Sequence, residues 1–127
     1  MSLDITPLVP AGRQVIQSYG SGRFLISDVE YSGPVLVFPE RSLEWGVGPL
    51  AELAPDSFAE IIGSEPKTEI LLLGCGARIS LPPAKVKSEL SAAGIVVEPM
   101  DTGAACRTFN VLMGEDRRVA AALFPVA

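Results

Sequence analysis

The sequence contains no histidine, and this absence limits the available chemistry more than any other feature of its composition. Without histidine the chain cannot form a Ser-His-Asp triad or a Cys-His pair, and it lacks the usual general base near neutral pH. Its two cysteines, Cys75 and Cys106, are too few for a disulfide framework of the secreted type or for a typical zinc site. We therefore expect neither a metal nor a resident cofactor. An enzyme of this composition would have to rely on carboxylates, lysine or a cofactor that it binds.

Long apolar runs and basic runs are also missing. No apolar run approaches the roughly 20 residues that a membrane-spanning helix requires. Ten basic residues stand against 15 acidic ones, and the resulting net charge of -5 argues against nucleic acid as the main partner. The first residues do not combine a basic stretch with an apolar one, so no secretory signal is predicted. We expect a cytoplasmic protein without a transmembrane segment.

The chain is nevertheless rich in apolar residues. Hydrophobic residues make up 48% of it, and the mean hydropathy is +0.36. A chain of 127 residues can bury a core without disulfides or metals, and no linker or repeat divides this one. We predict a single domain over residues 1–127, with residues 1–13 as a loosely ordered N-terminal segment. Part of the apolar surface is expected to be covered by a protein partner, a second copy of the chain included.

The first half of the sequence has the pattern of short antiparallel strands. Residues 13–28 predict two strands around a Gly-Ser-Gly turn at 20–22, where glycine permits a tight reversal. Residues 54–63 then predict a short helix that Gly63 ends. Between these segments lie three further β-type runs, at residues 29–31, 35–38 and 43–47. Turn residues separate these runs, which indicates an antiparallel layer.

The second half alternates strand, helix, strand, helix, strand. The mainly apolar runs at 69–73 and 95–98 are typical of strands covered on both faces, and residues 117–125 predict a last strand. Helices are predicted from the proline pair at 82–83 to Gly94 and from residue 101 to 114. Crossovers between parallel strands are right-handed and place helices against the sheet. The fold class predicted is mixed α and β, an antiparallel N-terminal part joined to a Rossmann-like β-α-β-α-β unit, with three helices in all.

The stretch LLLGCGARISLPP, residues 71–83, opens like a nucleotide-binding turn. Ile79 stands where a dinucleotide fingerprint needs its third glycine, and the following prolines remove backbone donors that a pyrophosphate requires. We interpret it instead as a sharp strand-to-helix turn. If strands 69–73 and 95–98 are parallel neighbours, their following loops meet at one end and form a crevice suited to a small anion or carboxylate. The residues predicted to line this crevice are Gly74, Cys75, Gly76, Arg78, Asp101 and Thr102.

Purely structural roles remain an alternative to ligand binding for these side chains. The acidic and hydroxyl residues at 101 and 102 could simply cap their own helix. We interpret Cys75 as a packing residue rather than a nucleophile, although Arg78 could activate it. We interpret Cys106 as a core residue. We assign structural or interaction roles to Arg107, which could pair with an acid at 115 or 116 or contact another protein, and to Asn110, which is expected to hydrogen-bond a loop backbone.

Three stretches resemble one known family. They are LLLGCGARISLPP, GIVVEPMDTGAACRTFNVLMGEDRRVAAALFP and FLISDVEYSGPVLVFPERSLEW, and together the likeness covers about residues 14–125. They are similar to the Mth-like domain family, which includes a mitochondrial respiratory complex I assembly factor and an adipogenesis-associated protein. The resemblance implies a compact α/β domain with a hammerhead-like β portion and no established catalytic residues. It also implies that threonine is more usual than cysteine at position 75.

Two classes of function follow. The first is a non-enzymatic interaction or assembly module, related to respiratory or membrane-complex assembly, which suits the acidic charge, the missing histidine and the apolar richness. The second is a small-ligand binding protein or minor enzyme that uses the crevice beyond strands 69–73 and 95–98.

Overall fold

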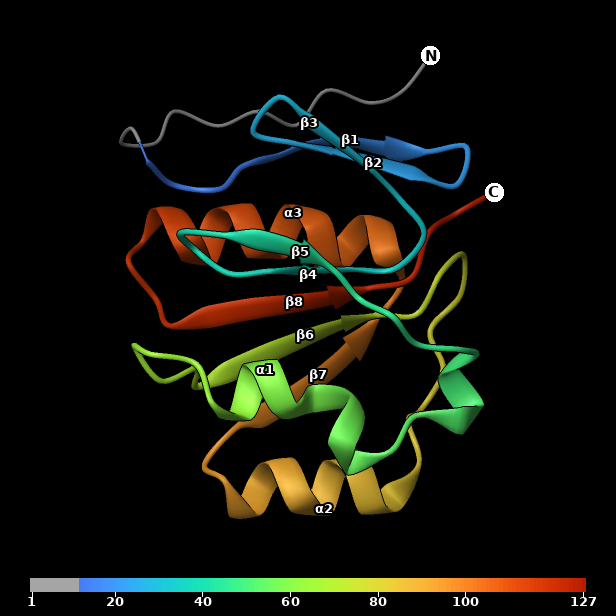
Figure 1. The fold of residues 1–127 in the computed structure, drawn as a ribbon, viewed down its shortest axis with the longest axis vertical. Helices are drawn as coiled ribbons and strands as arrows, with labels where there is room; N and C mark the ends of the chain where they lie inside the picture. The colour runs from blue at the N-terminus through green and yellow to red at the C-terminus, as the bar shows by residue number, and fades with distance from the viewer. Residues whose placement is uncertain (1–11) are drawn as a thin grey trace.

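A computed structural model describes residues 12–127 and arranges them in layers (Figure 1). A three-stranded sheet lies over one long helix, that helix lies over a five-stranded sheet, and the short helices cover the opposite face. The strands are β1 (Ile16–Gly20), β2 (Arg23–Ile26), β3 (Val29–Ser32), β4 (Val35–Val37), β5 (Ser42–Glu44), β6 (Ile70–Gly74), β7 (Val96–Met100) and β8 (Val119–Leu123). The helices are α1 (Ala59–Ile62), α2 (Ala84–Ala92) and α3 (Thr102–Gly114), with 3₁₀ turns at Leu50–Glu52 and Pro55–Phe58.

The small sheet has the order β1-β2-β3 and is antiparallel throughout. The predicted turn at residues 20–22 is confirmed, and all three of its residues have a positive φ. Most of the predicted loosely ordered segment, residues 1–11, lies outside the described residues, so that expectation stays a prediction.

The large sheet has the order β5-β4-β8-β6-β7. Strand β6 is parallel to both β7 and β8, which confirms the predicted neighbours of the second half. The expected antiparallel layer of the first half is divided, because β4 and β5 join this large sheet while β1 to β3 stay apart. The reason lies in the β4 sequence VLV, whose residues are all buried, so both faces of the strand need a covering layer.

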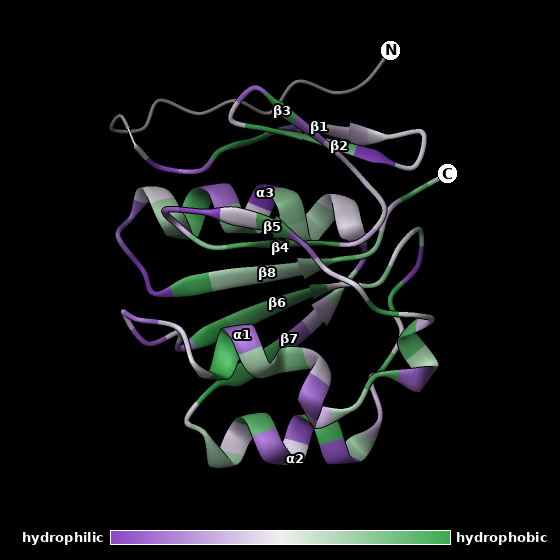
Figure 2. Cartoon of the chain, viewed as in Figure 1, coloured by the Kyte–Doolittle hydropathy of each residue, from purple (hydrophilic) through white to green (hydrophobic). Residues whose placement is uncertain are grey.

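Alternation along the central strands separates two apolar cores. Figure 2 shows these central strands, β6 and β8, largely in the green of hydrophobic residues. Leu72 of β6 faces α3 and the small sheet, whereas Leu71 and Leu73 face α1 and α2. This period of two is what a strand covered on both faces requires. The predicted helix at 54–63 is confirmed in part, since it begins as a 3₁₀ turn and continues as the short α1. Within residues 12–127 no helix combines the length and apolar character needed to cross a membrane.

Candidate functional site

The two loops predicted to form a crevice do meet, at a junction made by Gly76, Thr102 and Phe124. The Thr102 hydroxyl accepts a hydrogen bond from the Gly76 backbone N–H at 2.8 Å and donates one to the Phe124 carbonyl oxygen at 2.6 Å. The Thr102 N–H donates in turn to the Gly76 carbonyl oxygen at 2.9 Å. One buried side chain therefore ties together the end of β6, the start of α3 and the end of β8.

Close packing fills the same junction. A Cβ atom at Gly74 would lie 2.8 Å from the Leu123 Cδ2 atom and 3.2 Å from the Thr102 Cα atom, which explains why glycine stands there. Asp101 caps its own helix, because its side chain accepts a hydrogen bond from the Ala104 N–H at 2.9 Å. The polar groups at this end of the sheet thus bond to one another, and the ligand-binding crevice proposed for them stays a prediction.

Beyond the junction, residues 75–83 form a loop that we call the exposed loop. Its Cys75 thiol is half-buried and donates to the Ser80 carbonyl oxygen at 3.1 Å, which closes the loop on itself. Arg78 lies exposed on it, and the apolar side chains of Ile79 and Leu81 are 62% and 79% exposed. The proline pair at the end of the loop leads directly into α2. The loop is anchored at its base and presents apolar side chains outward.

The two residues assigned to α3 lie on its face towards the small sheet. Asn110 is buried, its Oδ1 atom accepts from the Ile16 N–H at 3.0 Å, and its Nδ2 atom donates to the Ile16 carbonyl oxygen at 2.9 Å. Asn110 therefore bonds to backbone groups as predicted, but they belong to strand β1 and not to a loop, so this part of the prediction is wrong. Arg107 donates to the Tyr19 hydroxyl at 3.3 Å, and it forms no ion pair with residue 115 or 116. Asp116 is bound by Arg13 instead.

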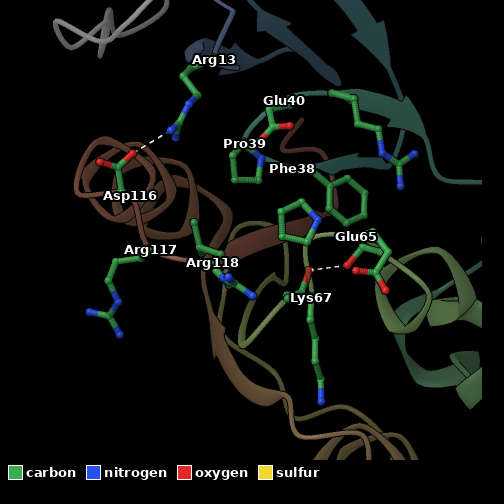
Figure 3. Close-up of a pocket in the computed structure, with 14 residues that line it drawn as sticks. Arg13, Phe38, Pro39, Glu40, Glu65, Lys67, Asp116, Arg117 and Arg118 are labelled. Carbon is green, nitrogen blue, oxygen red and sulfur yellow. Dashed lines mark hydrogen bonds and ion pairs between the residues drawn. The ribbon is translucent and has the colours of Figure 1, made fainter.

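A pocket of about 220 Å³ opens at the opposite end of the large sheet, where β6 and β8 begin (Figure 3). Sequence reasoning missed it, because four segments far apart in the chain build it. A signal was available in the charged clusters PER, SEPK and EDRR, of which the first two contain proline. PER follows β4, and the other two clusters precede β6 and β8. Its lining residues are Arg13, Phe38, Pro39, Glu40, Arg41, Ser64, Glu65, Pro66, Lys67, Thr68, Asp116, Arg117, Arg118 and Val119, and we call it the basal pocket.

Comparison with known proteins places the chain in a family. A family model described as a protein of unknown function, DUF498/DUF598, matches residues 16–124. The chain belongs to this family. The resemblance to Mth-like domains is also confirmed, since the solution NMR structure of a Bordetella pertussis Mth938-like domain matches with a TM-score of 0.78 and 29% identity. That match covers 97% of this chain and 92% of the other.

Two curated relatives add to this picture of the DUF498/DUF598 chain. It is 42% identical over 111 residues to NADH dehydrogenase (ubiquinone) 1 alpha subcomplex assembly factor 3 of Danio rerio, which covers 87% of this chain. The match spans 64% of the zebrafish protein, less than two thirds of its length. An uncharacterized protein of Rhodobacter capsulatus is 36% identical over 116 residues, 91% of this chain and 88% of that protein.

The two cysteines of this DUF498/DUF598 domain should differ sharply in reactivity. Burial raises the pKa of the Cys106 thiol to about 12, with Arg107 lowering it and Asp101 raising it by smaller amounts. Iodoacetamide should therefore modify Cys75 in the native protein, whereas Cys106 should react only after unfolding, as mass spectrometry of labelled peptides would reveal. Rapid native labelling of Cys106 would contradict this burial.

The raised pKa of Cys106 also predicts a dependence of stability on pH. Between about pH 9 and 12 the unfolded thiol loses its proton while the native thiol keeps it, so the free energy of unfolding should fall as pH rises. Its slope should reach at most about 1.4 kcal/mol per pH unit. Urea denaturation of the wild type and of Cys106→Ala from pH 8 to pH 11 tests this, and equal slopes for the two proteins would disprove it.

Proposed function

We propose that this chain is a non-enzymatic interaction module that helps to assemble a membrane-bound respiratory complex. The observation that carries the proposal is the exposed loop, which holds two large apolar side chains in solvent on an anchored backbone. The kinship with a protein named as an assembly factor for NADH dehydrogenase supports the same role. The partner is then a protein with an apolar surface, and a cytoplasmic location without nucleic acid remains part of the proposal.

The anchoring of the loop is what suits it to binding. A flexible loop loses conformational entropy when a partner orders it, and this loss weakens association. Here the Gly76 N–H is bonded to the Thr102 hydroxyl, and the Cys75 thiol is bonded across the loop to Ser80. Ile79 and Leu81 are therefore presented from a backbone that is already ordered. Apolar side chains that are fully removed from water at the centre of an interface contribute to its binding energy.

Replacing both apolar side chains tests the proposal. The double variant Ile79→Ser, Leu81→Ser should lower the amount of partner captured from host lysate by about tenfold, because the apolar anchors are lost. Its free energy of unfolding should change by less than about 0.5 kcal/mol, since the replaced groups lie in solvent. Quantitative mass spectrometry of the captured proteins, with in-cell cross-linking to subunits of the complex, provides the measurement.

A matched control comes from helix α3. Val111 is 59% exposed on a different surface, so Val111→Ser makes a similar change away from the loop. Capture should stay at the wild-type level with this variant. Equal capture by the double variant and the wild type would refute the role of the exposed loop, and an equal loss with Val111→Ser would show that the loop is not the docking surface.

A further inference from the structure

The basal pocket concentrates positive charge on an acidic protein. Five of the chain's 10 basic side chains line it, together with three of its 15 acidic ones, which leaves a formal excess of two positive charges. The whole chain has a net charge of -5. A concave region of opposite sign to the rest of the surface attracts anions and raises their local concentration.

Some of these charges already have partners. The Arg13 guanidinium lies 2.7 Å from the Asp116 carboxylate, so this acid is neutralised within the pocket wall. Arg41 stacks on the Phe38 ring at 4.3 Å and lies 3.4 Å from the Glu60 carboxylate. The other two lining acids, at positions 40 and 65, are exposed, as are the three remaining cations at 67, 117 and 118, so solvent screens charges of both signs.

Arg118 is the cation left to receive an anion. It forms no ion pair with any of residues 12–127, and Figure 3 shows it extending towards Lys67, while Arg117 points the other way. The Lys67 ammonium is turned to the end of helix α2, since a Cβ atom at Gly94 would lie 2.8 Å from it. A guanidinium presents paired N–H donors in a plane, a geometry that matches a carboxylate.

The uncharged residues of the pocket are four apolar side chains and two that carry hydroxyl groups. Phe38 and Val119 form buried parts of its wall, and the prolines at 39 and 66 complete it. Two buried hydroxyl groups, those of Ser64 and Thr68, lie 2.9 Å apart and bond to each other. A ligand therefore does not have to supply a hydrogen bond to either of them. The volume of about 220 Å³ is below the roughly 300–1,000 Å³ of pockets for drug-sized ligands.

The geometry points to a binding site for a small carboxylic acid, whose carboxylate meets Arg118 and whose short apolar stem lies against Phe38, Pro66 and Val119. Arg118 selects the acid group, the apolar wall selects the stem, and the volume limits its length. The site is separate from the exposed loop, because the two lie at opposite ends of strand β6. The ligand site and the proposed assembly role can therefore fail independently.

Titration of the ¹⁵N-labelled full chain with three probes tests this site. Hexanoate should give saturable amide shifts at residues 64, 65, 67, 68 and 117–119, with an affinity at least about fivefold higher than that of hexanamide or of inorganic phosphate. Hexanamide lacks the charge and phosphate lacks the stem. Equal binding of hexanamide would show that Arg118 does not recognise the charge of the ligand. Equal binding of phosphate would show that the apolar wall does not contribute to affinity. The absence of a saturable shift with hexanoate would overturn the site.

Variants at the two ends of the sheet complete the test. Arg118→Gln should weaken hexanoate binding by about tenfold, because it removes the charged hydrogen bonds to the acid. Arg78→Gln removes the same charge from the exposed loop and should leave the affinity unchanged. Both side chains lie in solvent, so denaturation midpoints should match the wild type. Unaltered affinity in Arg118→Gln, or an equal loss in Arg78→Gln, would contradict the assignment.

Discussion

Asn110→Ala is expected to lower the free energy of unfolding by about 3 kcal/mol. The Asn110 side chain binds both the N–H and the carbonyl oxygen of Ile16, at 3.0 and 2.9 Å, and the whole arrangement is buried. Its amide thus pairs with β1 as a further strand would, along the edge of the small sheet. Alanine leaves two backbone groups without these partners, and each such buried group costs about 1–3 kcal/mol.

The effect should be large relative to the stability of the whole domain, which for a chain of this size lies around 5–15 kcal/mol. The melting temperature should fall by about 10 °C or more. Calorimetry and urea denaturation provide the two measurements. Hydrogen exchange should also show the loss first in β1, since Asn110 ties this strand to α3.

Val111→Ala is the control for this prediction. It alters the neighbouring residue of the same helix, at a side chain that is 59% exposed and outside both cores. Helix propensity favours alanine slightly over valine, so stability should stay the same or rise. A loss with Asn110→Ala no greater than about 1 kcal/mol would mean that water or a rearranged side chain replaces the asparagine amide.

Much of the second half of the fold could be predicted because its signals are local. The apolar run at 70–73 has no polar position to turn towards solvent, which predicts a strand covered on both faces. Asp101 and the glycine at 114 mark the ends of α3 within one residue, since capping is a short-range interaction. The meeting of the loops at 74–76 and 100–102 then follows from the parallel pairing of β6 with β7.

The parts that could not be predicted depend on contacts between distant segments. Strand β4 has only three residues, and its place between β5 and β8 is set by pairing with residues more than 80 positions away. Arg13 and Asp116 are likewise joined across almost the whole chain. The basal pocket arises from such pairings. Its excess of positive charge cannot be predicted from any one short segment, because its cations come from segments far apart in the sequence.

Helix α3 links these observations. Its first residue fixes the junction beneath the exposed loop, its middle binds the small sheet, and the turn after it supplies Asp116 and Arg118 to the basal pocket. The helix therefore contributes to the packing at both ends of the sheet. This places both proposed surfaces on a shared, well-packed support.

Thr102→Val is expected to destabilise the domain by about 3 kcal/mol while preserving the shape of the side chain. The valine cannot accept the bond from the Gly76 N–H, now 2.8 Å from the threonine oxygen, nor donate to the Phe124 carbonyl oxygen. Gly76 and Thr102 are both buried, so water cannot readily replace the lost hydroxyl. Urea denaturation measures the loss.

Thr108→Val is the control for this prediction, because it makes the same substitution at another threonine of α3. Position 108 lies on the same helix, is half-buried, and has a hydroxyl that forms no hydrogen bond within residues 12–127, so valine there should change stability by less than about 0.5 kcal/mol. Thr102→Val should also weaken partner capture, because the Gly76 anchor holds the exposed loop in place. Equal destabilisation by the two variants would show that the Thr102 hydroxyl does not stabilise the junction. Undiminished capture by a destabilised Thr102→Val would show that ordering of the loop is not what makes Ile79 and Leu81 available to a partner.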